Sequence, residues 1–441
     1  MSPESRGLRA GLAALVAALT LAAGACREDE PPLRIGVVVD CVGINRSFEN
    51  AALSGAQLPL IERGARPRGR LARDGITEVE VGGRQVELVT GCTEVWEFST
   101  LARELRRLVE IEDVDAVVAA GIGPDAVVIR DVARDHPEVV FLPVVHGARE
   151  VTLRRPARNI FRFAADYGQG MAGLASYAYR RLGWRRAAVV LGNWDSGWQS
   201  RDAFMAEFCA LGGRVSAQIA LEALEGAGRV SEVPRDVDGV AVLATQFFRP
   251  AEFIKRLARR VAHPAREIVV GPGVVDEPDL LRATAPELAG VAASSYVDPR
   301  RMREYLRAYG RAFPGSSVAI ARHELVSGYR DAMEALLRAL EGADGSTKRL
   351  PAELARLRID LLGGPVRLDD SRQAVAATSL VRIEQGTAGS TQPALVPMDR
   401  VKNVDQSVGG LLSDSLSPSD QPAECRRGRR PPPWAGQIGT R

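Results

Sequence analysis

Residues 34–40, Arg34-Ile-Gly-Val-Val-Val-Asp40, form a nearly continuous apolar run that is typical of a β-strand buried on both faces. Similar runs recur along the chain, and between them apolar residues fall at helical spacing, as in Phe98, Leu101, Leu105 and Leu108. Buried strands that alternate with helices predict an α/β fold with a parallel sheet covered by helices on both faces. The strand candidates are 34–40, 86–90, 116–120, 139–144, 187–191, 239–245, 267–270 and 291–294.

This alternation is too long for one mononucleotide-binding half, and two doubly wound βα lobes in tandem account for it better. The chain has 441 residues, of which 46% are hydrophobic and 26% charged, a normal composition for a folded protein of two domains. Its formal net charge of +3 is too small to predict a nucleic-acid partner. Beyond residue 385 the composition changes to Gly, Ser, Thr, Pro and Asp, which predicts a disordered tail at 386–441.

The N-terminus carries the features of an export signal. Basic residues precede an apolar run at 10–23, which is followed by small residues and then by Cys26. This order is typical of a secretory signal peptide, here residues 1–25. A cysteine directly after the small residues resembles the lipobox of bacterial lipoproteins, in which Cys26 is lipidated, and residues 26–32 then form a spacer. We therefore expect an exported protein, anchored to the outer face of the cytoplasmic membrane or periplasmic; the alternative is a plain secreted protein.

Disulfides persist outside the cytoplasm, so the remaining cysteines are informative. Cys41 follows the first strand and Cys92 follows the second. In a doubly wound sheet these strand ends are neighbours, which predicts a Cys41–Cys92 disulfide; two free, partly buried thiols are the alternative. Cys209 in a helical stretch and Cys425 in the tail have no evident partner.

Signatures of catalysis are scarce. The four histidines have no second histidine or cysteine at metal-ligand spacing, and the sequence contains no Gly-x-Ser-x-Gly motif. We therefore expect no metal, no cofactor and no enzyme. One motif is nevertheless typical of an enzyme. Gly121-Ile122-Gly123-Pro-Asp-Ala126 matches the dinucleotide-binding pattern, so an exported NAD-dependent oxidoreductase is an alternative. The other interpretation is that this turn and the N–H groups of the helix after it bind a small carboxylate.

Ligands of such sheets bind at the carboxyl ends of the strands, so the loops after the strands are the site candidates. His146 and Gly147 follow the fourth strand. Trp194 and Trp198 lie on a loop rich in Gly, Asp and Ser after the fifth strand, where there is little core to fill. Phe248 follows the sixth strand. We expect these loops to line the ligand site, and packing in the core is the alternative for each aromatic residue.

Several short motifs follow one another in a distinctive order: Ile35-Gly36-Val37-Val38, Leu53-Ser54-Gly55-Ala56, Asn159-Ile-Phe-Arg162, Gln169-Gly170, Tyr305-Leu-Arg-Ala-Tyr309-Gly310, Phe313-Pro314, Gly328-Tyr329-Arg-Asp331-Ala332, Gly363-Gly-Pro365-Val366 and Asp369-Asp370. In this order, between about residues 33 and 385, the chain resembles the solute-binding lipoproteins of ABC importers, in the leucine/isoleucine/valine-binding branch. Each motif is common alone, and their succession carries the resemblance.

The resemblance implies the type I periplasmic binding protein fold, in which two α/β lobes joined by three strands close on a small ligand. It places lobe one at 33–157 and 297–360, and lobe two at 158–296 and 361–385. It also implies a monomer that is not an enzyme and that delivers its ligand to an ABC permease. A ligand-sensing receptor module with the same fold is the main alternative.

The resemblance further implies where the ligand binds. The ligand's carboxylate is expected at the turn Gly121–Gly123 and at Val144 and His146 after the fourth strand. Lobe two is expected to close on the ligand with Ser196 and Phe248. These positions predict that the ligand is an amino acid or a similar small carboxylate.

One family feature is changed in this chain. In the family, an acid that binds the ligand's amino group follows a Gly-Pro pair after the seventh strand. This chain has Gly273 there, and Asp276 and Asp195 are the candidates to replace that acid.

Overall fold

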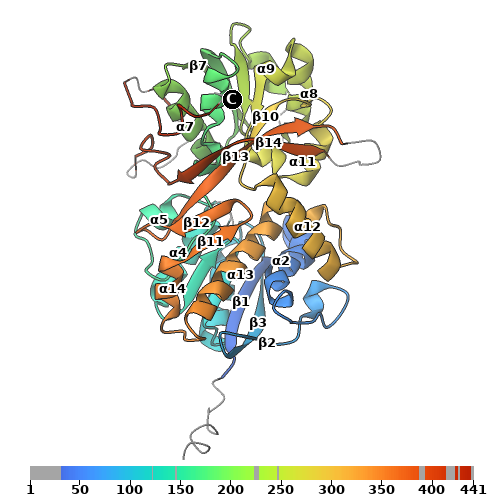
Figure 1. Cartoon of the computed structure of the whole chain (residues 1–441), viewed down its shortest axis with the longest axis vertical. Helices are drawn as coiled ribbons and strands as arrows, with labels where there is room; N and C mark the ends of the chain where they lie inside the picture. The colour runs from blue at the N-terminus through green and yellow to red at the C-terminus, as the bar shows by residue number, and fades with distance from the viewer. Residues whose placement is uncertain are drawn as a thin grey trace, which may run out of the picture.

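The computed structural model describes residues 31–121, 123–144, 147–222, 228–245, 248–386, 393–413, 423–425 and 428–438. These residues form two α/β lobes that lie one above the other along the long axis of the molecule (Figure 1). The predicted fold class is confirmed. The predicted signal peptide and Cys26 lie outside the described residues. No helix in the described part of the chain is long and apolar enough to span a bilayer.

Lobe one is built on a five-stranded sheet in the order β2–β3–β1–β4–β5, in which β2 is antiparallel to β3 and the other pairs are parallel. Its strands are β1 (Leu33–Asp40), β2 (Val79–Val81), β3 (Arg84–Thr93), β4 (Ala116–Ala119) and β5 (Val140–Pro143). Its helices are α2 (Glu49–Ile61), α3 (Phe98–Arg106), α4 (Asp125–Asp135), α5 (Glu150–Leu153), α12 (Pro299–Ala312), α13 (Glu324–Gly342) and α14 (Leu350–Arg356).

Both faces of this sheet are buried, which explains why β1 is apolar almost throughout. Its side chains alternate between the two faces, as the pleat of a strand requires. Ile35 and Val37 pack in the cluster that contains α2 and α13, whereas Val38 packs on the opposite face with α3 and α4.

The larger sheet has the order β11–β12–β13–β10–β9–β8–β6–β7, with β14 paired to β13. It runs from lobe two across the hinge, and its β11–β12 end packs in lobe one. Strands β10, β9, β8, β6 and β7 form its parallel part. The strands are β6 (Arg186–Gly192), β7 (Arg214–Leu221), β8 (Gly239–Val242), β9 (Ile268–Val270), β10 (Ala292–Ser295), β11 (Arg358–Leu361), β12 (Gly364–Leu368), β13 (Ala374–Glu384) and β14 (Ala394–Val404). The helices are α6 (Leu174–Arg180), α7 (Asp195–Ala210), α8 (Pro250–Arg260), α9 (Pro264–Glu267), α10 (Pro272–Val275) and α11 (Pro278–Thr284).

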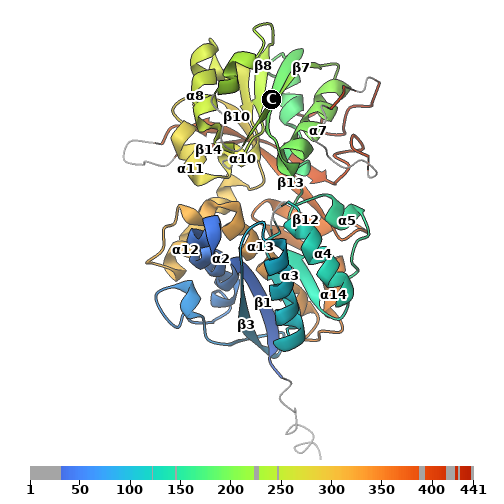
Figure 2. The same ribbon diagram turned by 180° about the vertical axis from the view of Figure 1, so that it is seen from behind.

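Three segments cross between the lobes, as predicted. The first runs from Phe163, in an apolar cluster of lobe one, to Met171, in one of lobe two. The second lies around Tyr296, between β10 and α12. The third is β13, whose residue Ala376 packs in lobe one and whose residue Val381 packs in lobe two. Figure 2 shows β13 passing from one lobe to the other.

The boundary between the lobes near residue 361 differs from the prediction. Residues 361–385 were expected in lobe two, but Leu361, Val366 and Leu368 pack in the apolar cluster of lobe one. The hairpin of β11 and β12 pairs with β13, which belongs to both lobes, so strand pattern alone could not assign it. The chain therefore passes into lobe two within β13.

The prediction of a disordered tail at 386–441 is wrong for its described part. β14 pairs antiparallel with β13, and the chain beyond it lies along lobe two beside α7 (Figure 1). Its few apolar residues are buried against α6 and α7; they include Val401, Val404, Trp434 and Ile438. A polar segment folds here because it covers an existing apolar face and does not need to form a core of its own.

Two disulfides connect distant parts of the chain. Cys41 and Cys92 are bonded, with Cα atoms 5.5 Å apart, as the neighbouring strand ends predict. This bond closes a loop of 51 residues, which in a chain-entropy model stabilises the fold by roughly 4 kcal/mol. Cys209 of α7 is bonded to Cys425, a pairing that the sequence analysis does not predict. The second bond attaches the C-terminal segment to lobe two.

Candidate functional site

The turn after β4 and the loop after β5 bring three predicted site residues together. Gly123 forms an isolated parallel bridge with Gly147, and a methyl group at Gly147 would lie 2.9 Å from the Gly121 carbonyl oxygen. Gly123 has a φ of +56°, a left-handed conformation that favours glycine. These two loops therefore lie side by side at the carboxyl ends of the neighbouring strands β4 and β5, where lobe one faces lobe two. Ile122 and His146 lie outside the described residues.

The start of α7 forms the facing wall, in lobe two. Trp194 directly precedes the helix, is 38% exposed, and places Nε1 3.2 Å from where a methyl group at Gly123 would lie. The Trp194 ring also lies 6.2 Å, centroid to centroid, from the ring of Trp96, which follows β3 in lobe one. The two lobes thus contact each other directly at Gly123, Trp96 and Trp194.

Other predicted site residues are held within one lobe. Phe248 is buried in an apolar cluster of lobe two, and Val144 in one of lobe one. Trp198 donates from Nε1 to Asn193 Oδ1 at 3.1 Å, and Ser196 is buried in the first turn of α7. Phe248 is thus a core residue, which was the alternative to ligand binding for each aromatic residue.

A small pocket lies between the lobes beside Gly273. Its lining includes Tyr167 and Tyr296 from the crossing segments and Glu277 from lobe two. Lobe one contributes Glu324, the first residue of α13. This pocket therefore draws acidic and phenolic side chains from both lobes and from the hinge.

A histidine–glutamate contact joins the lobes next to this pocket. His323 Nε2 lies 2.9 Å from Glu277 Oε2, and His323 Nδ1 accepts from the Leu325 N–H at 3.2 Å as the N-cap of α13. Burial lowers the pKa of His323, but the Glu277 carboxylate outweighs burial and raises it. Burial, reinforced by the negative charge of Glu277, raises the pKa of Glu324. Because Nδ1 accepts, Nε2 carries the hydrogen of the neutral ring and faces the Glu277 carboxyl group as a donor.

Two aspartates, each at the start of a helix, have strongly raised pKa values. Burial raises the pKa of Asp125 to about 7; a hydrogen bond from the Trp96 backbone opposes this shift and the charge of Asp40 adds to it. Burial raises the pKa of Asp195 to about 6, against a hydrogen bond from Gln199. Buried carboxyl groups with perturbed pKa values in a crevice are typical of functional sites.

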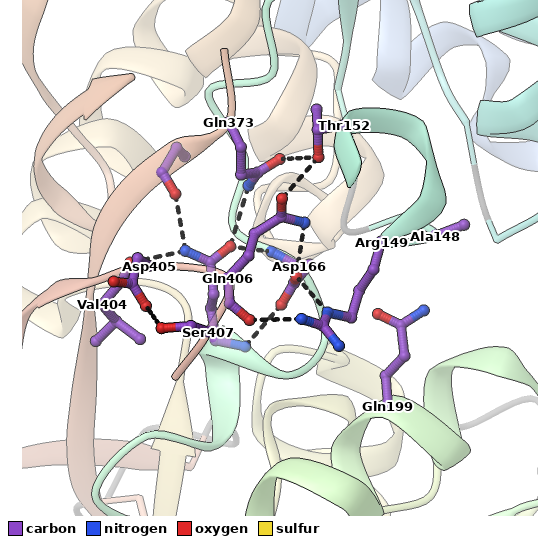
Figure 3. Close-up of polar contacts among 12 residues, drawn as sticks. Ala148, Arg149, Thr152, Asp166, Gln199, Gln373, Val404, Asp405, Gln406 and Ser407 are labelled. Carbon is purple, nitrogen blue, oxygen red and sulfur yellow. Dashed lines mark hydrogen bonds and ion pairs between the residues drawn. The ribbon is translucent and has the colours of Figure 1, made fainter. Parts of the chain in front are cut away.

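A buried polar network lies at the hinge (Figure 3). Asp166 accepts from Gln406 Nε2 at 3.0 Å and has an oxygen 3.5 Å from Arg149 Nε. Arg149 donates from Nη2 to the Gln406 carbonyl oxygen at 2.8 Å, and Thr152 donates from Oγ1 to Gln406 Oε1 at 2.8 Å. Arg149, Asp166 and Gln406 are 4%, 0% and 3% exposed, so the segment after β14 is an integral part of the hinge.

Three residues that take part in these contacts were not among the site residues predicted from the sequence: Trp96, Tyr167 and Gln406. Trp96 follows a predicted strand, as Trp194 does, so the rule that selected Trp194 could also have found Trp96. Tyr167 lies on the first crossing segment, outside any loop that follows a strand. Gln406 lies in the tail, where composition gives no signal for a buried position.

The comparisons with known proteins agree on one family. A family model described as periplasmic binding protein matches residues 32–388. An ABC transporter substrate-binding protein from Sphaerobacter thermophilus superposes with a TM-score of 0.73 at 20% identity, covering 85% of this chain and 99% of that one. A solute-binding protein from Rhodopseudomonas palustris BisB5, in complex with 3,4-dihydroxybenzoic acid, gives 0.70 at 18% identity, covering 86% and 99%. A leucine-binding protein from Thermotoga maritima gives 0.66 at 18% identity, covering 84% and 99%. No curated protein matches the sequence.

Proposed function

Because the chain belongs to the periplasmic binding protein family, we propose that it is the extracytoplasmic solute-binding component of an ABC importer, which delivers its ligand to a permease. Proteins of this family bind solutes and catalyse no reaction. The direct contact between the glycine turn of lobe one and Trp194 of lobe two carries the proposal, because a ligand held there touches both lobes at once. Such a ligand favours the closed arrangement through contacts that only this arrangement provides.

The proposed ligand is an amino acid or a similar small carboxylate. Solved relatives are complexes with isoleucine, from Streptococcus pneumoniae, and with 3,4-dihydroxybenzoic acid. In this chain the turn Gly121–Gly123 leads directly into α4, and helix N-termini favour carboxylates. We place the ligand's carboxylate at this turn and its remainder against Trp194.

Isothermal titration of the purified protein tests this function. We expect saturable one-to-one binding of at least one member of a panel of amino acids, amides and aromatic carboxylates, accompanied by a rise in melting temperature. Absence of both responses across the whole panel would contradict the proposal.

A matched pair of glycine variants locates the site. Gly123→Ala puts a methyl group into the contact with Trp194. We expect its affinity for the ligand to fall at least roughly 10-fold, and a 10-fold loss corresponds to about 1.4 kcal/mol of binding free energy. Gly83→Ala carries the same left-handed backbone strain but meets nothing within 4 Å, so its affinity should equal that of the wild type. Equal affinities in the two variants would place the ligand elsewhere.

We also propose that Cys26 is lipidated and anchors the protein outside the cytoplasmic membrane. The support is the signal-like N-terminus together with the family, whose members work outside the cytoplasm. Replacing Cys26 with Ser is expected to move the protein from the membrane fraction to the soluble exported fraction, measured by fractionation and immunoblotting. A Cys26→Ser variant that stays in the membrane fraction would refute the anchor. Replacement of a residue in the spacer, such as Glu28→Gln, serves as the control and should leave the protein membrane-bound.

A further inference from the structure

The proposed ligand class contains two chemical types, which differ in one group. An amino acid carries an ammonium group on the carbon that also bears the carboxylate, whereas a benzoate or an aliphatic acid has no such group. A protein that selects the amino acid must therefore present an acceptor, usually an acid, beside the turn that binds the carboxylate. The sequence leaves Asp276 and Asp195 as candidates for this acid.

Asp276 is fully engaged within lobe two. Its Oδ1 accepts from the Ser295 hydroxyl at 2.6 Å, and its Oδ2 accepts from the Tyr296 N–H at 2.8 Å. The side chain is 7% exposed and fixes the end of β10, where the chain leaves for lobe one. Asp276 is therefore a structural residue whose two oxygens are already satisfied.

Among the residues that the structure describes, Asp195 differs from Asp276 in having one oxygen without a hydrogen-bond partner. As the first residue of α7, it accepts at Oδ1 from Gln199 Nε2 at 2.7 Å. Its Oδ2 is shielded from solvent and has no hydrogen-bond partner among the residues that the structure describes. A methyl group at Gly123 would lie 3.8 Å from this oxygen, so Oδ2 faces the turn of lobe one. A buried, unpaired carboxylate oxygen is costly, and a ligand that donates to it would remove that cost.

Lobe one presents a second such oxygen. Asp125, two residues after Gly123, is 5% exposed, and its Oδ1 also lacks a partner within the described part of the chain. Trp194 directly precedes Asp195, the Trp96 backbone donates a hydrogen bond to Asp125, and the two rings lie 6.2 Å apart, centroid to centroid. Aromatic surface of this kind attracts organic cations.

We infer that Asp195 binds an ammonium group of the ligand, so that the protein selects amino acids over carboxylates without an amine. This inference rests on the proposed function and specifies its ligand class. The raised pKa of Asp195 agrees with it, because an ammonium ion would stabilise the ionised carboxylate that burial disfavours.

Titration calorimetry with pairs of ligands that differ only in the amine tests the inference. Suitable pairs are leucine with 4-methylpentanoate and phenylalanine with 3-phenylpropionate, measured at pH 7.5. We expect the amino acid of a recognised pair to bind roughly 10- to 100-fold more tightly, the effect of a hydrogen bond between charged groups. If the acid without an amine binds equally well, the inference is overturned while the proposed function survives. If no amino acid, amide or carboxylate binds, the proposed function itself fails, and the inference with it.

An isosteric variant assigns the effect to Asp195. Asp195→Asn should weaken amino-acid binding roughly 10- to 100-fold and leave binding of the acid without an amine within about 3-fold. The control is Asp202→Asn on the same helix. Asp202 is already paired with Arg201 at 2.8 Å, so this variant should bind both ligands as tightly as the wild type does. An unchanged amino-acid affinity in Asp195→Asn would overturn the inference.

The pH dependence gives an independent check. Asp195 must be ionised to bind an ammonium group, and burial raises its pKa to about 6. The wild-type affinity for an amino acid should therefore rise from pH 5 to pH 7 and level off above that range. The part of this rise that is due to Asp195 should be absent in Asp195→Asn. A wild-type affinity that is flat or falls with pH would contradict the assignment.

Discussion

Truncation of the chain after Gly386 is expected to abolish stable folding, although composition alone predicts that this tail is dispensable. The segment that would be lost contributes buried Val401, Val404, Trp434 and Ile438 to an apolar cluster of lobe two. Burial of each such side chain contributes about 1.5–3 kcal/mol. The sum exceeds roughly 5 kcal/mol, which is comparable to the whole stability of an ordinary domain.

Circular dichroism melts and the yield of soluble protein measure this effect. We expect the truncated chain to show no cooperative transition above room temperature, or to accumulate only as insoluble material. A chain that ends after Ile438 loses only three residues and should melt like the wild type. A truncated protein with a cooperative melt within a few degrees of the wild type would show that the C-terminal segment contributes little.

Replacement of Asp166 by Ala is expected to lower the free energy of unfolding by about 3–5 kcal/mol, the usual effect of removing one partner of a buried ion pair. Asp166 is fully buried, and its loss leaves the Arg149 guanidinium, itself 4% exposed, without its carboxylate. Gln406 also loses its acceptor at 3.0 Å. Urea denaturation at constant pH gives the measurement.

Two further variants separate charge burial from simple side-chain loss. Asp236→Ala removes one partner of an exposed pair with Arg186 and should cost less than about 1 kcal/mol. The double variant Asp166→Ala/Arg149→Met removes both buried charges and should recover part of the loss seen in Asp166→Ala. If Asp166→Ala costs no more than Asp236→Ala, the hinge network does not stabilise the fold.

The strands whose bounds the sequence predicts most closely are those that are apolar almost throughout. β1 and β6 are apolar almost throughout, and the predicted runs 34–40 and 187–191 lie within one residue of their bounds. β7 was not predicted because it is an edge strand, in which partly exposed residues alternate with buried ones. β14 was missed for a related reason: it covers β13 from one side, and much of it stays partly exposed.

The proposed site could be predicted from sequence where backbone geometry decides it. Gly123 could be found from a glycine pair after a strand, and Trp194 from an aromatic residue in a polar loop at a strand end. The proposed preference for Asp195 over Asp276 could not be predicted from sequence, because it depends on which carboxylate is already bonded within its own lobe. Gln406 also gave no signal, because an amide in a polar tail looks the same whether it is exposed or bonded at a hinge.

The order of the disulfides along the chain has a consequence for how the protein matures. Four free thiols can pair in three ways, and the native pattern joins each cysteine to the next one, Cys41 to Cys92 and Cys209 to Cys425. During export from the N-terminus, Cys92 reaches the oxidising compartment before Cys209 does, so the first pair can form while no competing thiol is present. With the Cys26 sulfur occupied by lipid, as proposed, oxidation in order of emergence yields the native bonds without reshuffling. The last bond waits for the export of Cys425, so lobe two is cross-linked only after the disulfide of lobe one can have formed.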